Sequence, residues 1–468
     1  MSPSSTWLAR RPWQTQAAGR ATHHTLGDGD FRHFARMTSE VTCAQASLTV
    51  DNATDEIDRV LSEAIERRLP GYLLLPADVA EAPSEAPVSP LHEHPGVTSP
   101  EALADFRDAA RALLENAGDV AVLADILIQR MGARASLDAL LARGLPHATL
   151  LWGRRVVDES SPGYLGTYIG AVSSPAVKEG IEGADALILA GVQFTDLTSG
   201  FFSQRLPEDR TIDVGPRSAR IGGRTYAPLA LGDALDALTE LIASREAPVN
   251  SPAAASHAPA AASPAGTQPL DQPLDQGGLW DLVAGHLRPG DLVLADQGTS
   301  FYGMGNHELP HDVIFIGQPL WAAIGYTMPA ALGAALADPS RRPIVLIGDG
   351  AAQLTIAEFG TLLRHRIPAL VVIVNNAGYT IERAIHGADK PYNDIAQWDW
   401  PALASALGPA AGAQALTART AGELDAALAA AEEFPQRLTL IEAIVPPLDV
   451  PPLLAALAKQ ASAANAAR

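Results

Sequence analysis

A Gly-Asp-Gly triplet ends one apolar stretch of the sequence, and an Asn-Asn pair ends the next. The triplet is Gly348-Asp349-Gly350 and the pair is Asn375-Asn376. An Asp carboxylate, an Asn amide oxygen and a nearby backbone carbonyl are oxygen ligands of the kind that Mg²⁺ prefers. Mg²⁺ usually completes its octahedron with water and phosphate oxygens. The pattern therefore predicts a site for a metal-bridged phosphate or diphosphate.

The apolar stretches predict the elements that must position these residues. Residues 343–350 and 369–374 indicate buried strands, and the stretch between them carries a helical stripe of apolar side chains. A strand–helix–strand unit of this kind has parallel strands and a right-handed crossover. Because parallel strands place their carboxyl ends at one sheet edge, we expect Asp349 and Asn376 to meet there. Gly350 then opens the helix, whose first N–H groups favour an anion.

A second Gly-Asp-Gly triplet, Gly27-Asp28-Gly29, provides an internal control. No Asn-Asn pair follows it at the same distance. A short motif without its partner is more often a simple turn than a ligand site. The sequence therefore predicts a turn at this triplet.

The composition restricts the class of protein. The 468 residues carry a formal net charge of -20 and are 47% hydrophobic, which fits two or three globular domains. Because binding to phosphate backbones depends on Lys and Arg, the acidic balance argues against a nucleic-acid partner. Cys43 is the only cysteine, so an intrachain disulfide and a Cys-x-x-Cys metal site are excluded. We expect no secretory leader, no membrane span and a cytoplasmic location.

Stretches rich in Pro and Ala mark the expected domain boundaries. Residues 247–273 have the composition of an exposed linker, and residues 77–100 form a softer boundary. Between these boundaries, apolar runs alternate with helix-like stretches, as in a parallel α/β domain. The Ala-rich C-terminus is expected to be a surface helix without chemistry. The predicted divisions are a first segment, a middle domain, a linker and a C-terminal domain, at residues 1–78, 79–246, 247–273 and 274–468.

Several segments resemble the thiamine-diphosphate-dependent α-keto-acid decarboxylases, the pyruvate and indolepyruvate decarboxylase family. The spacing of Gly-Asp-Gly and Asn-Asn is similar to the thiamine diphosphate signature, and the resemblance runs from about Ala18 to Pro451. It is carried by "HHTLGDGDF", "DESSPGYLG", "LADQGTSFYG", "IGQPLWAAIGYTMPAALGAA" and "NNAGYTIERAIHG", followed by "YNDI". The resemblance implies an α/β thiamine-diphosphate-binding fold with parallel sheets flanked by helices, and a Rossmann-like middle domain.

The resemblance also implies a role for each matching residue. Mg²⁺ would be held by Asp349, Asn376 and the carbonyl of Gly378. Ile324 would be the apolar wedge that bends thiamine diphosphate into a V shape. The other cofactor-binding positions would be Gly298, Thr299, Ser300, Gly348, Gly350, Ala351, Tyr379, Thr380 and Ile381. His23, His24 and Glu382 would handle protons, since a carboxyl group in a desolvated pocket can donate a proton near neutral pH.

The implied reaction is non-oxidative decarboxylation of an α-keto acid to an aldehyde, with the cofactor accepting the electrons released as CO₂ leaves. The His pair and Glu382 favour this reaction over that of an acetolactate-synthase-like carboligase, which is the alternative chemistry. The small side chain of Ala384 favours a branched-chain or aromatic substrate. The family also implies homodimers or homotetramers with cofactors between the subunits.

The sequence departs from the family before the His pair. Family members carry a "VPGDYN"-like stretch and a "NELNA"-like stretch with the glutamate that activates the cofactor, and neither occurs in this sequence. Residues 18–75 are therefore expected to be a poorly packed remnant of a pyrimidine-binding domain. Two hypotheses follow. One is a decarboxylase whose sequence results from a misplaced start codon or a frameshifted gene. The other is a remnant or partner subunit that binds the metal diphosphate with negligible turnover.

Overall fold

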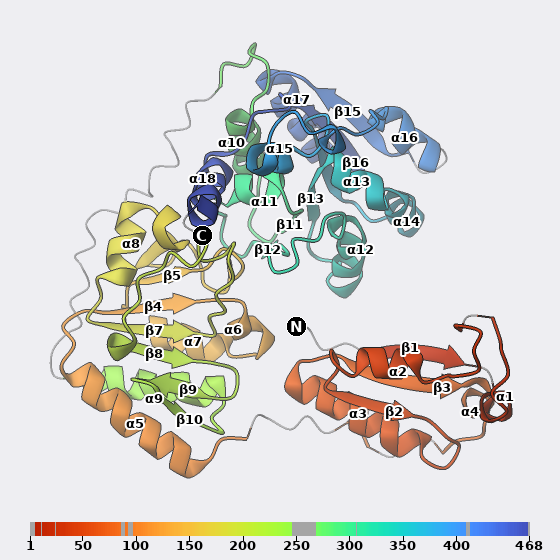
Figure 1. Cartoon of the computed structure of the whole chain (residues 1–468). Coiled ribbons are helices and arrows are strands. Elements are labelled where there is room, and N and C mark those ends of the chain that lie inside the picture. Colours follow the sequence, from red (N-terminus) through yellow and green to blue (C-terminus); the bar gives the residue numbers. More distant parts are fainter. Residues whose placement is uncertain are drawn as a thin grey trace.

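A computed structural model describes residues 5–10, 12–23, 25–85, 89–91, 97–245, 268–305, 307–408 and 412–466. These residues form three α/β units, each built on its own sheet (Figure 1). The sheets have three, seven and six strands and are predominantly parallel, with helices packed on their faces. The α/β fold class predicted from the sequence is confirmed. His24 and most of the predicted linker, at 247–267, lie outside the described residues.

The first unit is small. Its sheet has the order β1-β3-β2, and both pairings are parallel. The buried hydrophobic side chains of its core are Ala44, Leu48, Val60 and Leu73, whereas Trp13 and Met37 are more than half exposed. Phe31, Ala64, Tyr72 and Leu74 of this unit are buried as well. The elements are β1 (Ser5–Arg10), α1 (Trp13–Ala17), α2 (His33–Thr38), β2 (Ala44–Ser47), α3 (Ala53–Arg67), β3 (Gly71–Pro76) and α4 (Ala77–Ala80).

The middle unit has the sheet order β10-β9-β8-β7-β4-β5-β6, with five parallel strands and an antiparallel edge. Helices α5, α7 and α9 contribute to one core cluster and α8 to another, on the two faces of the sheet. The strands are β4 (Val120–Ala124), β5 (His147–Thr149), β6 (Tyr164–Thr167), β7 (Ala186–Ala190), β8 (Thr211–Val214), β9 (Ala219–Ile221) and β10 (Arg224–Tyr226). The helices are α5 (Pro100–Glu115), α6 (Leu127–Arg130), α7 (Arg134–Leu141), η1 (Gly170–Val172), α8 (Pro175–Glu182), η2 (Glu208–Arg210) and α9 (Leu231–Ala243).

The C-terminal unit has a fully parallel sheet in the order β12-β11-β13-β14-β16-β15. Side chains of β13 alternate between the two cores, because successive residues of a strand face opposite sides of a sheet. The strands are β11 (Leu292–Ala295), β12 (Ile314–Ile316), β13 (Pro343–Gly348), β14 (Leu370–Asn375), β15 (Gln414–Ala418) and β16 (Thr439–Ile444). The helices are α10 (Gln276–Gly285), α11 (Thr299–Met304), α12 (Thr327–Ala337), α13 (Asp349–Thr355), α14 (Ala357–His365), α15 (Thr380–His386), η3 (Pro391–Asn393), α16 (Trp400–Leu407), α17 (Ala421–Glu433) and α18 (Pro452–Ala466).

The strand–helix–strand unit predicted around the Gly-Asp-Gly triplet is present. Strands β13 and β14 pair in parallel, with Gly348 opposite Val374 at their carboxyl ends. The crossover contains two helices, α13 and α14, which are interrupted at Ile356, where the sequence predicted a single helical stripe. The interruption lies beyond the first turn of α13, so the triplet still ends the strand and opens a helix.

Helix α18 corrects the prediction of a surface helix at the C-terminus. Its leucines Leu453, Leu454 and Leu457 are at most 4% exposed, and the helix packs against α11, α15 and η1. Figure 1 shows α18 beside both the middle and the C-terminal units. Because the apolar stripe of α18 faces these elements, the helix is part of the core. Within the described part of the chain, no helix is both long and apolar enough to span a membrane.

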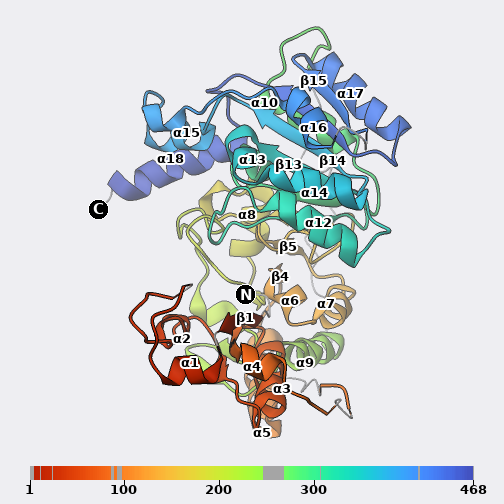
Figure 2. The ribbon, with the colours of Figure 1, turned by 90° about the vertical axis from the view of Figure 1, so that its right-hand side faces the viewer.

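A buried ion pair joins the middle unit to the C-terminal unit, which lies above it in both views (Figures 1 and 2). Arg154 and Glu159, in the loop after β5, pair at 2.8 Å and are almost completely buried. Arg154 also donates to the carbonyl oxygens of Met304 (2.6 Å) and His307 (2.5 Å). Residues 150–153 follow β5 and lead from the sheet to this contact.

Candidate functional site

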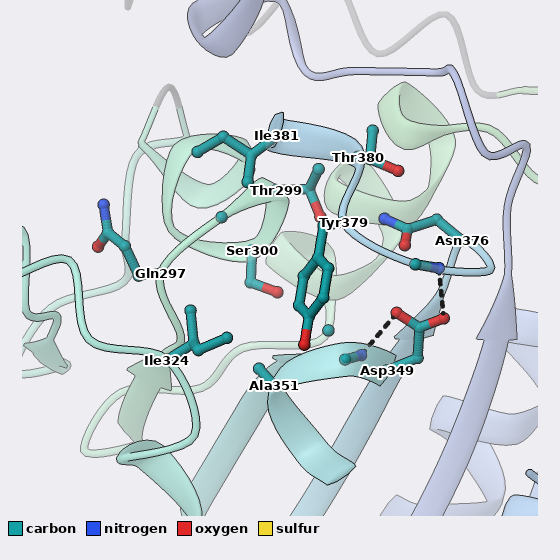
Figure 3. A pocket seen from close by; sticks show the side chains of 14 residues that line it. Gln297, Thr299, Ser300, Ile324, Asp349, Ala351, Asn376, Tyr379, Thr380 and Ile381 are labelled. Atoms are coloured by element: carbon teal, nitrogen blue, oxygen red, sulfur yellow. Dashed lines mark hydrogen bonds between the residues drawn. The ribbon is translucent and has the colours of Figure 1, made fainter. Parts of the chain in front are cut away.

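A pocket lies at the carboxyl ends of β11, β13 and β14 and encloses about 380 Å³ of empty space, part of it open to solvent. Figure 3 shows its polar end around Asp349 and Asn376 and its apolar end around Ile324 and Ile381. All of the predicted metal and cofactor-binding positions line it. The lining residues are Gln297, Gly298, Thr299, Ser300, Ile324, Gly348, Asp349, Gly350, Ala351, Asn376, Gly378, Tyr379, Thr380 and Ile381.

Three short helices begin at this pocket. Helix α11 begins at Thr299, α13 at Asp349 and α15 at Thr380. The first backbone N–H groups of a helix have no acceptor within the helix, and they carry partial positive charge. Three sets of such groups converge on one pocket, an arrangement that suits an anion with several oxygens.

The Asp349 carboxylate is anchored by the backbone at the polar end of the pocket. Its Oδ1 accepts from the N–H of Gly350 (2.8 Å), and its Oδ2 accepts from the N–H of Gly378 (3.1 Å). Asp349 is 2% exposed, and this burial raises its pKa to about 6. A buried carboxylate with no cationic side chain bonded to it is stabilised by a bound cation.

The Asn376 amide lies directly beside Asp349. With its nitrogen turned inward, it donates to Gly378 O (2.6 Å) and Asp349 Oδ1 (3.2 Å), and its oxygen accepts from Thr380 Oγ1 (3.0 Å). With its oxygen turned inward, three oxygens stand together at these separations. Because Mg–O distances are about 2.0–2.1 Å, neighbouring corners of the Mg²⁺ octahedron are about 3 Å apart. The donor set and its spacing therefore fit Mg²⁺.

Two buried polar atoms in the pocket wall have no hydrogen-bond partner within the described chain. They are Ser300 Oγ, on a side chain that is 2% exposed, and Gln297 Oε1. Buried polar groups are nearly always hydrogen-bonded. A diphosphate oxygen would satisfy the Ser300 hydroxyl, so the wall near α11 also fits the cofactor.

The loop that carries Ile324 is held by Asp296. The carboxylate of Asp296 accepts from the N–H of Gly325 (3.1 Å) and from Thr327 Oγ1 (2.7 Å). Ile324 is thereby fixed at the apolar end of the pocket, where a hydrophobic wedge is expected. Sequence reasoning missed both Asp296 and Gln297. Their signal was present in "LADQGTSFYG", since both directly follow a buried strand at the functional sheet edge.

Gly350 is required by the close approach of Tyr379. A Cβ atom at this position would lie 2.5 Å from the Tyr379 ring. Figure 3 shows this ring reaching from the start of α15 toward Ala351. The glycine therefore lets Tyr379 pack over the first turn of α13.

Of the three residues predicted to handle protons, His23 and Glu382 do not line the pocket. The Glu382 side chain is 44% exposed and pairs with His386 at 3.4 Å, so the desolvated environment expected for this carboxyl is not present around it. The reason is that Thr380 and Ile381 face the pocket from α15, whereas Glu382 is directed toward His386 and solvent. His23 is exposed in the first unit, and His24 lies outside the described residues.

Side chains alone do not define the metal site. In the described part of the chain, no cluster of three or more His, Cys, Asp or Glu residues could hold a metal ion. The predicted ligand set contains only one residue of these types, Asp349, together with an amide and a backbone carbonyl. Such a set depends on the conformation of the loop after β14.

Comparisons with known proteins agree with this geometry. Residues 302–443 match the family model of the thiamine pyrophosphate enzyme C-terminal TPP-binding domain, and residues 107–241 match that of the thiamine pyrophosphate enzyme central domain. The middle and C-terminal units are thus domains of a thiamine pyrophosphate enzyme.

Similar proteins define the class further. The chain is 52% identical to an alpha-keto-acid decarboxylase of Mycolicibacterium paratuberculosis over 448 residues, covering 96% of this chain and 78% of the relative. It is 50% identical to an alpha-keto-acid decarboxylase of Mycobacterium leprae over 458 residues, covering 97% and 79%. The chain therefore belongs to the thiamine-diphosphate-dependent α-keto-acid decarboxylases, which are carboxy-lyases.

Proposed function

We propose that this protein converts branched-chain or aromatic α-keto acids to aldehydes and CO₂, using thiamine diphosphate and Mg²⁺. The observation that carries this proposal is the convergence of Asp349, Asn376 and the Gly378 carbonyl beside three helix N-termini. A metal-bridged diphosphate satisfies both features at once, because the cation needs the oxygens and the anion needs the N–H groups.

Different residues of the pocket would bind different parts of the cofactor. Asp349, Asn376 and Gly378 would bind Mg²⁺, while the N–H groups at the starts of α11, α13 and α15 and the Ser300 hydroxyl would bind the diphosphate. Ile324 would support the rings at the apolar end. When bound, thiamine diphosphate supplies the electron sink for loss of CO₂.

Proton handling requires an acid or base besides Asp349, and the described residues of the pocket wall include no other carboxylate and no histidine. We propose that His23, His24 and Glu382 complete the site when subunits associate, in a cytoplasmic homodimer or homotetramer. The support is that Glu382 follows the pocket residues Thr380 and Ile381 on α15 and is accessible at the surface. Light scattering coupled to size-exclusion chromatography tests this assembly. A strictly monomeric protein that is fully active would contradict it.

Substrate choice is proposed from the apolar end of the pocket. Ile324 and Ile381 line it, and the small Ala384 lies one turn further along α15. A hydrophobic wall with a small neighbour favours a large apolar substrate side chain. Comparing kcat/KM for pyruvate, 2-ketoisocaproate and indolepyruvate tests the choice, and a clear preference for pyruvate would contradict it.

A second candidate is a protein that binds the metal diphosphate without turnover. It is favoured by one observation, namely that Asp349 is the only carboxylate among the described residues of the pocket wall. The two candidates separate when binding of thiamine diphosphate with Mg²⁺ and aldehyde formation from phenylpyruvate are measured on one preparation. Binding with turnover supports the decarboxylase, binding alone supports the second candidate, and absence of binding contradicts both.

A further inference from the structure

The loop that carries two of the proposed Mg²⁺ ligands is held in an unusual conformation. It comprises Asn376, Ala377 and Gly378, directly after β14. Ala377 has φ 57° and Gly378 has φ 138°, both in the region that favours glycine. A non-glycine residue adopts this conformation only when its surroundings enforce it. The contacts that enforce it should therefore also set the positions of the ligand atoms.

Arg383 makes these contacts. Its Nη1 donates to Asn376 O (3.2 Å) and its Nη2 donates to Ala377 O (2.8 Å), so one guanidinium binds two consecutive carbonyls of the loop. The Arg383 side chain is only 7% exposed. It lies on α15, on the outer side of the loop, and it is not among the residues that line the pocket.

Asn393 and Asp394 contact both Arg383 and the loop backbone. Arg383 Nη2 also donates to Asp394 Oδ1 (2.9 Å) and contacts Asn393 O (3.4 Å). The Asn393 carbonyl accepts from the N–H of Tyr379 (2.9 Å), and Gly378 forms an antiparallel bridge with Asp394. These two residues belong to "YNDI", a segment whose resemblance to the family carried no role. They therefore link Arg383 to the backbone of Gly378 and Tyr379.

The packing leaves little room for the loop to move. A Cβ atom at Gly378 would lie 2.1 Å from Asn393 O and 2.7 Å from Arg383 Nη2. The Gly378 N–H is at the same time bonded to Asp349 Oδ2 at 3.1 Å. The loop is thus confined between Asp349 on the pocket side and Arg383 with Asn393 on the outer side.

We propose that Arg383, together with Asn393 and Asp394, is a positioning residue for the metal loop, holding the Gly378 carbonyl and the Asn376 amide toward Asp349. This inference rests on the proposed function, because it assigns the loop to a divalent cation that bridges a diphosphate. Arg383 acts through the backbone and would touch neither the cation nor the cofactor, since it does not line the pocket. A planar guanidinium suits this role because its five N–H donors have a fixed geometry, whereas an ammonium group is a point charge on a flexible stem.

The first experiment measures the loop itself, in the full-length protein without cofactor. Hydrogen exchange of the segment 375–380 reports the protection of the Gly378 and Tyr379 amides, which bond Asp349 and Asn393. We expect Arg383→Met to increase exchange in this segment by about tenfold or more and Arg383→Lys to give a smaller increase. Unchanged exchange in both variants would overturn the proposal.

The second experiment measures the consequence for binding. Thiamine diphosphate is held constant and MgCl₂ is titrated, with binding followed by calorimetry. Loss of an outer support for metal ligands typically weakens metal binding about 10–100-fold. We expect Arg383→Met to raise the half-saturating Mg²⁺ concentration by that amount, with binding recovered at high Mg²⁺. Arg383→Lys should fall between Arg383→Met and the wild type.

Arg341 provides a matched control in the same unit. It also donates to backbone carbonyls, those of Gly290 (3.2 Å) and Asp312 (2.8 Å). These residues lie at the amino ends of the strands, whereas the pocket lies at the carboxyl ends. Arg341→Met should therefore leave both the exchange of 375–380 and the Mg²⁺ dependence within about twofold of wild type. An equal loss in Arg341→Met would show that general loosening of the unit explains the effect, and would overturn the positioning role.

The outcomes separate this inference from the proposed function. If the wild-type protein does not bind thiamine diphosphate with Mg²⁺, the proposed function fails, and hydrogen exchange still decides whether Arg383 holds the loop. If the wild type binds and the Arg383 variants share its Mg²⁺ dependence, the positioning role fails alone. Should Arg383→Met not fold, Arg383→Lys carries both measurements, because it keeps the charge and much of the volume of the side chain.

Discussion

The chain contains the tripeptide Gly-Asp-Gly twice, and the two copies occupy opposite environments. Asp349 lies at the end of β13, is 2% exposed, and has a pKa that burial raises to about 6. Asp28 lies in a bend of the first unit, is 47% exposed, and pairs with His33 at 2.6 Å, a hydrogen bond that lowers its pKa. The same three residues thus form a candidate ligand site in one place and a surface bend in the other.

The difference comes from the strands around each triplet. Gly348 ends a central strand of a six-stranded parallel sheet, so the carboxyl ends of β11 and β14 flank it. Gly27 precedes α2 and belongs to none of the strands described in the first unit. A carboxylate becomes buried and surrounded by backbone donors only at a sheet edge of the first kind. The position of the tripeptide relative to a sheet edge therefore decides its chemistry.

The largest expected effect comes from removing each carboxylate. Asp349→Asn should weaken Mg²⁺-dependent binding of thiamine diphosphate by roughly 100-fold or more, since it removes a charged ligand itself. Asp28→Asn should leave this binding unchanged, because Asp28 does not line the pocket. Calorimetric titration of both variants measures the difference. Equal binding of thiamine diphosphate by Asp349→Asn and wild type would contradict the assignment of Asp349, and not Asp28, as a metal ligand.

A smaller effect is expected in the pH dependence of stability of the metal-free protein. Burial raises the folded-state pKa of Asp349 from 3.8 to about 6, so the folded state binds more protons than the unfolded state in this interval. The free energy of unfolding should therefore fall as the pH rises from about 4 to about 6, by about 3 kcal/mol at most. Asp349→Asn should flatten this slope in denaturant unfolding with EDTA present.

Asp28 should show the opposite sign in a different pH range. Its pKa is lowered by the hydrogen bond with His33, so its contribution is present above the ordinary value of 3.8 and is lost as the pH falls below it. Asp28→Asn should therefore leave the slope between pH 4 and pH 6 unchanged. If the free energy of unfolding had the same slope between pH 4 and pH 6 in Asp349→Asn and Asp28→Asn, the role assigned to burial of Asp349 would be contradicted.

The smallest effects are expected from the glycines. Gly350→Ala should weaken cofactor binding by roughly tenfold, because its Cβ atom would lie 2.5 Å from the Tyr379 ring in the pocket. Gly27→Ala meets no atom within 4 Å but has φ +75°. It should cost about 1 kcal/mol of stability without changing cofactor binding. Thermal unfolding and calorimetry of both variants measure the two effects. Weakened cofactor binding by Gly27→Ala would contradict the conclusion that only the triplet at Asp349 belongs to the site.

The site could be predicted from the sequence where local pattern and sheet geometry decide it. Asp349 and Asn376 follow consecutive apolar strands, and parallel pairing brings the ends of such strands together. Their meeting required no knowledge of distant contacts. The fold class followed from the same alternation of apolar runs and helical stripes.

The remainder depended on contacts between residues distant in sequence. The hydrogen bonds of Arg383 to Asn393 and Asp394 arise from the path of the loop after α15, which no periodic pattern records. Helix α18 was predicted to lie at the surface because its composition is mostly Ala, yet its leucines face α11 and α15. The contact of Arg154 with the Met304 carbonyl joins two units that are distant in sequence. Tertiary contacts override local preference at each of these places.

The ion pair of Arg154 and Glu159 has a practical consequence for dissecting this protein. A cut in the Pro- and Ala-rich stretch would separate two halves that share this contact, leaving the carbonyls of Met304 and His307 without their donor. The halves would also expose apolar surface where α18 meets η1. Autonomous expression of the C-terminal half should consequently yield aggregates, whereas co-expression of both halves should restore a stable, isolable pair.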